Sequence, residues 1–243
     1  MARINLQPPA GLDRRADGTV EVHSVFLTLQ GEGPWAGVPA VFVRLSGCNI
    51  SCPGCDTEYT SVWIRSTPDQ VLNAVRVKGK PTPDHKAPEL VVVTGGEPFR
   101  QDCGPMVKEL LSAGYTVQIE TNGLLNPPPG FPMASPNLSV VVSPKGAQIA
   151  PRLRDRLSTG VHLKYVLRAG EVDPKDGLPT AVLENGRMPA KPPAFVAPWQ
   201  IFLQPMDEQD EERNAANRKA VVESCLRFGY RACLQLHKIL NLD

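Results

Sequence analysis

The sequence predicts an α/β fold built around a parallel β-sheet. Short apolar runs rich in β-branched residues alternate with stretches of helical period, and this alternation is typical of repeated βα units. Glycine and proline fall between the two kinds of segment. Eight runs are candidate strands, of which some must be edge or accessory strands: 20–29, 40–45, 89–94, 115–121, 138–143, 162–167, 199–204 and 230–236.

Three segments between these runs are predicted helices. Thr67-Pro68-Asp69 has the pattern of an N-cap followed by proline at the first helical position, so a helix is expected from there to about Lys78. A second is expected over 102–113, where Gly114 provides a C-terminal stop. The third is expected over 208–227, with charged residues at its start.

The length and proline distribution favour a single domain. The chain has 243 residues, enough to bury a sizeable core. Residues 1–19 have no periodicity and are expected to form a flexible tail, so the domain is expected to cover 20–243. Two proline-rich stretches, 125–136 and 168–198, are expected to be surface excursions. No internal repeat indicates a solenoid or a second domain.

Charge and hydropathy exclude some classes of protein. The net charge is +1, which gives no electrostatic footprint for nucleic acid or an anionic membrane. No run of 18 apolar residues could span a bilayer, and the N-terminal residues lack the apolar stretch of a signal peptide. A cytoplasmic protein that binds neither membrane nor nucleic acid is expected.

Three of the six cysteines, Cys48, Cys52 and Cys55, fall within eight residues. Disulfides are rare in a reducing cytoplasm, and clustered thiolates are more often metal ligands. A closed zinc site needs four protein ligands, whereas a 4Fe-4S cluster held by three cysteines leaves one iron open to a chelating substrate. The alternative is a zinc site completed by His23 or His85, although neither histidine has a recognisable ligand spacing. The other three cysteines, at 103, 225 and 233, are expected to pack as small apolar residues.

Polar motifs follow several of the apolar runs, at what would be the carboxyl ends of strands. They are Thr94-Gly95-Gly96-Glu97-Pro98, Glu120-Thr121-Asn122-Gly123, Ser143-Pro144-Lys145, Gln204-Pro205-Met206-Asp207 and Gln235-Leu236-His237-Lys238. Each alone could be an ordinary solvated turn. Because active sites of parallel barrels lie at the carboxyl ends of the strands, motifs that recur there predict one shared site. The G-x-G at Gly31 and Gly33 lacks the third glycine and long crossover helix of a dinucleotide site.

The cysteine spacing after 40–45 resembles the cluster motif of the radical S-adenosylmethionine superfamily. That resemblance implies a partial (incomplete) TIM-type parallel β/α barrel with the cluster after its first strand. It further implies that the amino acid part of S-adenosylmethionine chelates the open iron. One electron from the cluster then releases a 5′-deoxyadenosyl radical, the hard chemistry being that of the cofactors.

A more specific resemblance covers most of residues 20–243. The segments FLTLQGEG (26–33), CDTEYT (55–60), VVVTGGEP (91–98), SPK, QPMD and the terminal LHK, together with Arg44, occur in the order found in 7-carboxy-7-deazaguanine synthases. Those enzymes are homodimers that convert 6-carboxy-5,6,7,8-tetrahydropterin to 7-carboxy-7-deazaguanine in queuosine and deazapurine biosynthesis. The resemblance implies a radical-based lyase that takes electrons from a flavodoxin- or ferredoxin-type donor.

The family resemblance also implies roles for single residues. The cluster ligands would be Cys48, Cys52 and Cys55, and Thr57 would bind Mg²⁺. Contacts to S-adenosylmethionine are implied for Gly54, Cys55, Asp56, Gly96, Glu97, Ser143, Pro144, Lys145, Gln204, Pro205, Met206 and Asp207. Contacts to the pterin are implied for Leu29, Gln30, Gly31, Glu32, Arg44, Thr94, His237 and Asp243, with Arg44 pairing with the carboxylate of the substrate.

One position departs from the superfamily pattern, and two rival functions share part of the motif. Many members have an aromatic residue before the third cysteine, where this chain has Gly54, so packing on the adenine must come from elsewhere. A glycyl-radical activase shares the cysteine spacing and small size, but FLTLQGEG and Arg44 argue against it. The other rival is a non-enzymatic zinc-binding module.

Overall fold

A single curved sheet forms the framework of the protein. The computed structural model describes residues 8–52, 55, 57–157, 159–182 and 187–242. Within these residues nine strands lie in the order β3-β1-β2-β4-β5-β6-β7-β8-β9. The strands are β1 (Val20–Leu29), β2 (Pro39–Leu45), β3 (Ile64–Ser66), β4 (Leu90–Gly95), β5 (Thr116–Thr121), β6 (Leu138–Val142), β7 (Val161–Leu167), β8 (Ile201–Pro205) and β9 (Arg231–Ala232).

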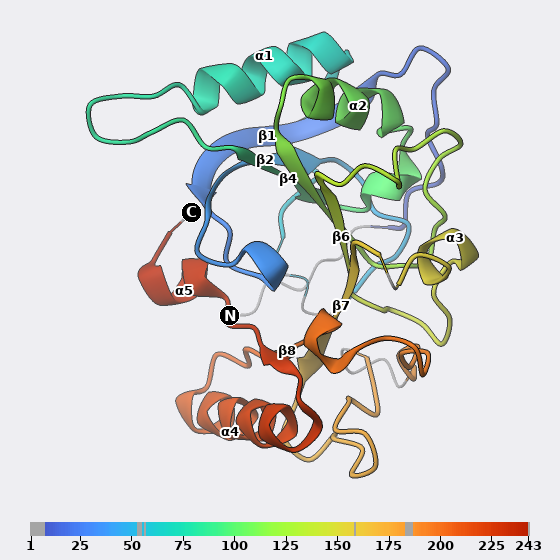
Figure 1. Ribbon diagram of the computed structural model, residues 1–243, viewed down its shortest axis with the longest axis vertical. Coiled ribbons are helices and arrows are strands. Elements are labelled where there is room, and N and C mark those ends of the chain that lie inside the picture. Colours follow the sequence, from blue (N-terminus) through green and yellow to red (C-terminus); the bar gives the residue numbers. More distant parts are fainter. Residues whose placement is uncertain (1–7, 53–54, 56, 158, 183–186, 243) are drawn as a thin grey trace.

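The sheet is parallel from β2 to β9, and β1 pairs antiparallel with both β2 and β3. It curls into an open arch (Figure 1). The helices are α1 (Pro68–Lys78), α2 (Gly104–Ser112), α3 (Pro151–Arg154), α4 (Glu211–Phe228) and α5 (Leu236–Leu240), with 3₁₀ turns η1 (Gly33–Trp35), η2 (Pro98–Arg100) and η3 (Pro198–Gln200). Helices α1 to α4 lie outside the arch and α5 lies at its open side (Figure 1). This is the predicted partial barrel.

Burial on both faces explains the continuous apolar runs of the central strands. In β4, Val91 and Val93 pack in the main core with α1 and α2, whereas Leu90 and Val92 form a smaller cluster with Ala40 inside the arch. A parallel strand covered on both faces lacks the period-2 alternation of a half-exposed strand. Alternate side chains of β4 therefore pack on opposite faces of the sheet. A shift of one residue relative to β2 would exchange these faces, so the packing specifies the register of the two strands.

The three helices predicted from the sequence are present as α1, α2 and α4. Thr67 caps α1 in a capping box, because its Oγ1 accepts a hydrogen bond from the amide of Gln70 while its own amide donates to Gln70 Oε1. Helix α2 begins at Gly104 and helix α4 at Glu211, two and three residues later than expected. The delay in α4 follows from Asp210, whose carboxylate accepts from the amide of Arg213 and so marks the N-cap.

Three features differ from the sequence-based expectation. The strand β3 falls in a segment for which no strand was expected, and the run at 230–236 forms only the two-residue β9 before α5 begins. Residues 8–19, predicted to belong to a flexible tail, lie against the domain: the Asp13 amide donates to the Arg100 carbonyl (2.9 Å) and Arg14 donates to the Phe99 carbonyl (2.8 Å). In the described ranges, no helix is both long and apolar enough to cross a membrane.

Candidate functional site

Two adjoining cavities open at the carboxyl ends of the parallel strands. The cysteine cavity, of about 280 Å³, is lined by Cys48, Cys52 and Cys55. The arginine cavity, of about 340 Å³, is lined by Arg44 and the end of β1. Both are lined by a common set of residues: Glu32, Thr57, Thr94, Glu120, Gln235 and Lys238. Two ligands bound in these cavities would therefore lie side by side.

The three cysteines lie in the loop after β2, as the motif predicts. Burial raises the pKa of Cys48 to about 11 and also raises that of Cys52, so binding of a cluster must displace protons from these sulfurs. Among the described residues, no three His, Cys, Asp or Glu side chains are close enough together to hold a metal ion. The donor set itself, three sulfurs lining one cavity, fits a cluster with one open iron.

Neither histidine of the zinc alternative lines the cysteine cavity. His23 contacts the hydroxyl groups of Ser24 (3.2 Å) and Ser61 (3.4 Å), and His85 contacts the Lys86 carbonyl (3.4 Å). A four-ligand zinc site built from the three cysteines and one of these histidines finds no support in this arrangement.

The glycines after β4 allow the backbone that precedes Cys48 to approach closely. A Cβ on Gly96 would lie 1.9 Å from the Gly47 carbonyl oxygen, so no other residue fits without moving the backbone. The Gly96 amide donates to the Leu45 carbonyl (3.0 Å), and the Glu97 amide donates to the Gly47 carbonyl (2.9 Å). This segment therefore holds the residues that lead into the cysteine loop.

The Glu97 carboxylate is fully buried beneath the cavity rather than lining it. It accepts hydrogen bonds from the amides of Phe99 (3.0 Å) and Asn122 (2.8 Å) and from the Thr121 hydroxyl (2.8 Å). Burial raises the pKa of Glu97 to about 7 although these three donors lower it. Glu97 thus joins the ends of β4 and β5 in this structure.

Polar groups from β6 and β8 complete the cysteine cavity. Lys145, which follows β6, is half-buried, and desolvation lowers its pKa while the neighbouring Cys52 raises it. Gln204 also lines the cavity, and its Oε1 has no hydrogen-bond partner among the described residues. A buried acceptor without a partner is costly, so it fits a site at which a ligand donates a hydrogen bond. Asp207 accepts from Lys238 (2.9 Å) and thereby joins the end of β8 to α5.

An aromatic stack supports Arg44 in the arginine cavity. The guanidinium lies 5.2 Å from the centre of the Phe26 ring, and Phe26 stacks on Phe42 with the ring centres 5.4 Å apart. Arg44 and Phe42 alternate with outward-facing residues of β2, which places both inside the arch. A planar cation fixed on an aromatic face is suited to a planar carboxylate.

Helix α5 covers the end of β1 at the arginine cavity. The Leu236 amide donates to the Gly31 carbonyl (3.3 Å). A Cβ on Gly31 would lie 2.6 Å from His237 Nδ1, so glycine is needed for α5 to pack here. His237 itself lines the cavity.

Charged residues in the wall between the cavities were not all identified from the sequence. Glu120 accepts from Gln30 Nε2 (2.9 Å) and the Thr94 hydroxyl (2.8 Å), and Lys164 pairs with Glu32. Glu120 stands in a motif that the sequence had placed at the shared site. The signal for Lys164 was a charge in the middle of a strand that is otherwise apolar.

Most of the predicted site residues line one of the two cavities. The cysteine cavity receives Cys48, Cys52, Cys55, Gly96, Ser143, Lys145, Gln204, Met206 and Asp207, and the arginine cavity receives Leu29, Gln30, Arg44 and His237. Glu32, Thr57 and Thr94 line both. Pro144 lines a separate small cavity, and Pro205 ends β8 outside the lining of either large cavity. Gly54, Asp56 and Asp243 lie outside the described residues.

Known proteins resemble the chain over nearly its whole length. It is 42% identical to the 7-carboxy-7-deazaguanine synthase of Rhodospirillum rubrum, over 97% of each chain. It is 35% identical to that of Rickettsia prowazekii, over 93% of this chain and 91% of the relative. The crystal structure of QueE from Escherichia coli has the same fold, with a TM-score of 0.63 at 24% identity over 89% of this chain and 94% of that one. No protein-family model matches the chain. The identity and coverage of these curated relatives mean that the chain belongs to the 7-carboxy-7-deazaguanine synthase family.

Proposed function

We propose that the protein is a radical S-adenosylmethionine lyase that converts 6-carboxy-5,6,7,8-tetrahydropterin to 7-carboxy-7-deazaguanine. The reaction contracts the reduced pyrazine ring and releases one ammonia, so it is balanced without a net oxidant or reductant. The product would enter queuosine or related deazapurine biosynthesis. The relatives that share its sequence over nearly its whole length carry this enzyme name.

The observation that carries the proposal is the pair of adjoining cavities. The residues expected to hold the cluster and S-adenosylmethionine line one cavity, and those expected to hold the pterin line the other. A radical reaction between two bound molecules needs them in contact and protected from solvent. Because six residues line both cavities, molecules bound in the two cavities would lie side by side, as the reaction requires.

In the cysteine cavity, Cys48, Cys52 and Cys55 would hold a 4Fe-4S cluster. The cluster supplies the electron that cleaves S-adenosylmethionine when both are bound. Around it, Lys145 offers a half-buried ammonium group, and Gln204 offers an acceptor that has no partner among the described residues. These groups fit the carboxylate and the amino or hydroxyl donors of an amino acid nucleoside.

In the arginine cavity, Arg44 would bind the carboxylate of the pterin. Glu32 and Glu120 present half-buried carboxylates that can accept hydrogen bonds from the N–H groups of its pyrimidine ring. Lys164 pairs with Glu32, and its charge lowers the pKa of Glu120, although burial and the charge of Glu32 raise that pKa overall. Thr94, which donates to Glu120, fixes the orientation of that carboxylate.

Three further parts of the proposal concern metal, partners and assembly. Thr57 lines both cavities, which suits a ligand of a Mg²⁺ ion that bridges protein and substrate.

A flavodoxin- or ferredoxin-type protein would reduce the cluster. Leu226 in α4 and Ile239 in α5 are 82% and 63% exposed, and exposed apolar side chains of this kind support the proposal of a homodimer that would bury them.

An anaerobic assay tests the function. The protein, reconstituted with iron and sulfide, is incubated with S-adenosylmethionine, a reductant, Mg²⁺ and carboxytetrahydropterin. The expected result is 5′-deoxyadenosine together with 7-carboxy-7-deazaguanine. If the two do not appear together, the proposed substrate is wrong.

A cysteine comparison tests the cluster site separately. Replacing Cys48, Cys52 and Cys55 with alanine should remove bound iron and sulfide. Cys225→Ala is the matched control, since Cys225 lies in α4 and lines neither cavity. Equal iron in both variants would contradict the assignment of the ligands.

A further inference from the structure

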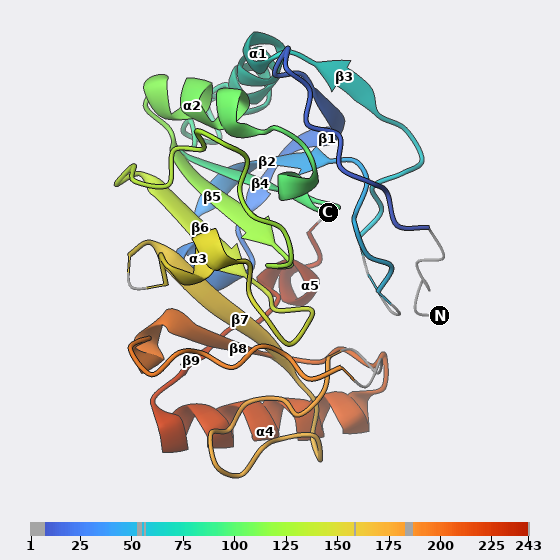
Figure 2. The ribbon, with the colours of Figure 1, turned by 90° about the vertical axis from the view of Figure 1, so that its right-hand side faces the viewer.

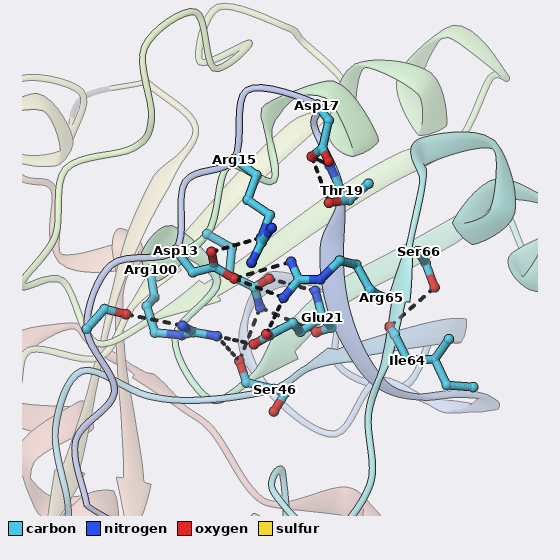
Figure 3. Close-up of polar contacts among 12 residues, drawn as sticks. Asp13, Arg15, Asp17, Thr19, Glu21, Ser46, Ile64, Arg65, Ser66 and Arg100 are labelled. Carbon is cyan, nitrogen blue, oxygen red and sulfur yellow. Dashed lines mark hydrogen bonds and ion pairs between the residues drawn. The ribbon is translucent and has the colours of Figure 1, made fainter.

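The carboxylate of Glu21 joins the two ends of the segment that carries the cysteines. Glu21 lies in β1, and its Oε2 accepts from Arg100 Nη2 (2.7 Å) while its Oε1 accepts from Arg65 Nη2 (2.6 Å). Arg100 holds the chain before Cys48, and Arg65 follows the cysteine loop in β3. Figure 3 shows Glu21 between the two arginines.

Before the cysteines, each consecutive backbone carbonyl has a hydrogen-bond donor. The Ser46 carbonyl accepts from Arg100 Nη2 (3.0 Å) and from Gln101 Nε2 (3.1 Å). Its neighbours, the carbonyls of Leu45 and Gly47, accept from the amides after β4 described above. Gly47 has a φ of +75°, and a Cβ there would lie 2.8 Å from the Arg100 guanidinium. The backbone is therefore fixed up to the residue before Cys48.

After the cysteines, the chain returns to β1 through β3. Arg65 lies directly opposite Glu21 in the antiparallel pair of β1 and β3. It also lies against Asp13, at 3.4 Å, and its guanidinium is 5.5 Å from the Trp63 ring centre. Since β3 has only three residues, side-chain contacts must supply much of what holds this end of the loop.

The N-terminal segment forms hydrogen bonds and an ion pair with residues of the same network. The Ala10 amide donates to the Cys48 carbonyl (2.7 Å), and the Gly11 carbonyl accepts from Arg100 Nη1 (3.1 Å). Asp13 binds both Arg65 and Arg15. Residues 10–13 thus contact the first cysteine and both arginines that hold its loop.

Arg100 is the central element of this network because of its burial. Its side chain is 5% exposed, and it donates to one carboxylate and two carbonyls. A buried guanidinium needs acceptors of this kind to offset the cost of removing its charge from water, and here both Nη1 and Nη2 have them. Among the described residues, Glu21 is the only carboxylate that forms an ion pair with Arg100, so it is the group that balances this buried charge.

We propose that Glu21 is a positioning residue that, with Arg100 and Arg65, holds both ends of the cysteine segment at the separation needed to close three sulfurs around a cluster. The proposal rests on the cluster site of the proposed function. Its role is to fix the backbone on either side of the cysteine loop, so that three sulfurs can bind one cluster with a small loss of conformational entropy.

Three variants test this role. Glu21→Gln removes the charge that joins the two arginines, and Arg65→Met releases only the downstream end, leaving the buried Arg100 pair intact in case the first variant folds poorly. Arg65→Lys restores one ion pair and should recover part of the effect. The matched control is Asp176→Asn, which breaks the ion pair with Lys191 (2.8 Å). Asp176 lies in the loop after β7, where the neighbouring Gly177 carbonyl accepts from Ser224 of α4. Helix α4 and strand β3 lie at opposite ends of the molecule (Figure 2).

Two measurements separate this proposal from the proposed function. Amide hydrogen exchange of residues 45–66 in the cluster-free protein should be at least about tenfold faster in Glu21→Gln and Arg65→Met than in the control. After reconstitution, iron should be lost to a chelator roughly tenfold faster in both variants, and the electron paramagnetic resonance signal of the reduced cluster should broaden. Arg65→Lys should lie between Arg65→Met and the wild type in both measurements.

Exchange and iron loss equal to those of Asp176→Asn in every variant would overturn the role of Glu21, even if the wild type makes the expected product. Conversely, a wild-type protein that binds no cluster would overturn the proposed function. Faster hydrogen exchange in the Glu21→Gln and Arg65→Met proteins would then still support the role of Glu21 in holding the ends of the cysteine segment.

Discussion

Lys164 and Glu32 form an ion pair across the inside of the arch, although their strands are far apart in the sheet. Lys164 comes from β7 and Glu32 follows β1, which lies beyond β2 in the strand order. Burial lowers the Lys164 pKa, but the charges of Glu32 and Glu120 outweigh that effect and raise the pKa overall. Curvature of the sheet therefore creates a charged wall between the two cavities.

Replacing Lys164 with methionine should impair catalysis and shift its pH dependence. Without the ammonium, the pKa of Glu120, which burial already raises, should rise further, so the acidic limb of kcat/KM should move to higher pH. The loss of a buried partner should also lower the free energy of unfolding by about 3 kcal/mol. Lys191→Met is the control because Lys191 also lies between two carboxylates, Asp173 and Asp176, but lines neither cavity. An unchanged pH profile would contradict the proposed role.

Arg44→Lys should weaken binding of a substrate carboxylate. Lysine keeps the charge but loses the planar fork, so kcat/KM should fall about 30-fold, equivalent to about 2 kcal/mol. Arg231→Lys is a matched control, since Arg231 also stacks on an aromatic ring, that of Phe202 at 4.8 Å, outside both cavities. With a pterin that lacks the carboxylate, kcat/KM of Arg44→Lys should be much closer to that of the wild type. If Arg44→Lys lowers kcat/KM by the same factor for both pterins, Arg44 does not bind the carboxylate.

Gly31→Ala should displace α5 from the arginine cavity. The new methyl group would meet the His237 ring and the backbone amide of Leu236, so α5 must move rather than one side chain. We expect KM for the pterin to rise roughly tenfold, because small displacements at a site have large kinetic effects. The melting temperature should change by less than about 2 °C, since α5 buries little of the core. Gly11→Ala is the control, because a methyl there meets no atom within 4 Å.

His162 should make the folded protein sensitive to acid. Burial, and then the charge of Arg231, lowers the His162 pKa from 6.5 to about 4. A depressed folded-state pKa gives stability that is present above pH 6.5 and is lost as the pH falls through about 4.

Chemical denaturation of the wild type and His162→Phe at pH 7 and pH 4 measures this effect. The wild type should lose up to about 3 kcal/mol more than the variant, since one pKa unit corresponds to about 1.36 kcal/mol. His85→Phe, in an exposed turn, serves as the control. If the wild type and His162→Phe lose the same stability, the imidazole is not held neutral by its surroundings.

The sequence by itself determined the parallel α/β class and the place of the candidate site at the carboxyl ends of the strands. Strands buried on both faces must be continuous apolar runs, and caps such as Thr67 and Gly114 are local features, so both are visible without tertiary information. The motifs at strand ends also converged as predicted, because parallel strands bring their carboxyl ends to one edge.

Only the tertiary structure decided which long-range contacts complete the site. The burial of Glu97, the packing of α5 on Gly31 and the pairing of Lys164 with Glu32 depend on how far the sheet curls. The N-terminal segment likewise gains its order from Arg100 and Arg65, which are remote from it in sequence. Local patterns describe one segment at a time, whereas these contacts exist only when separate segments have been folded against one another.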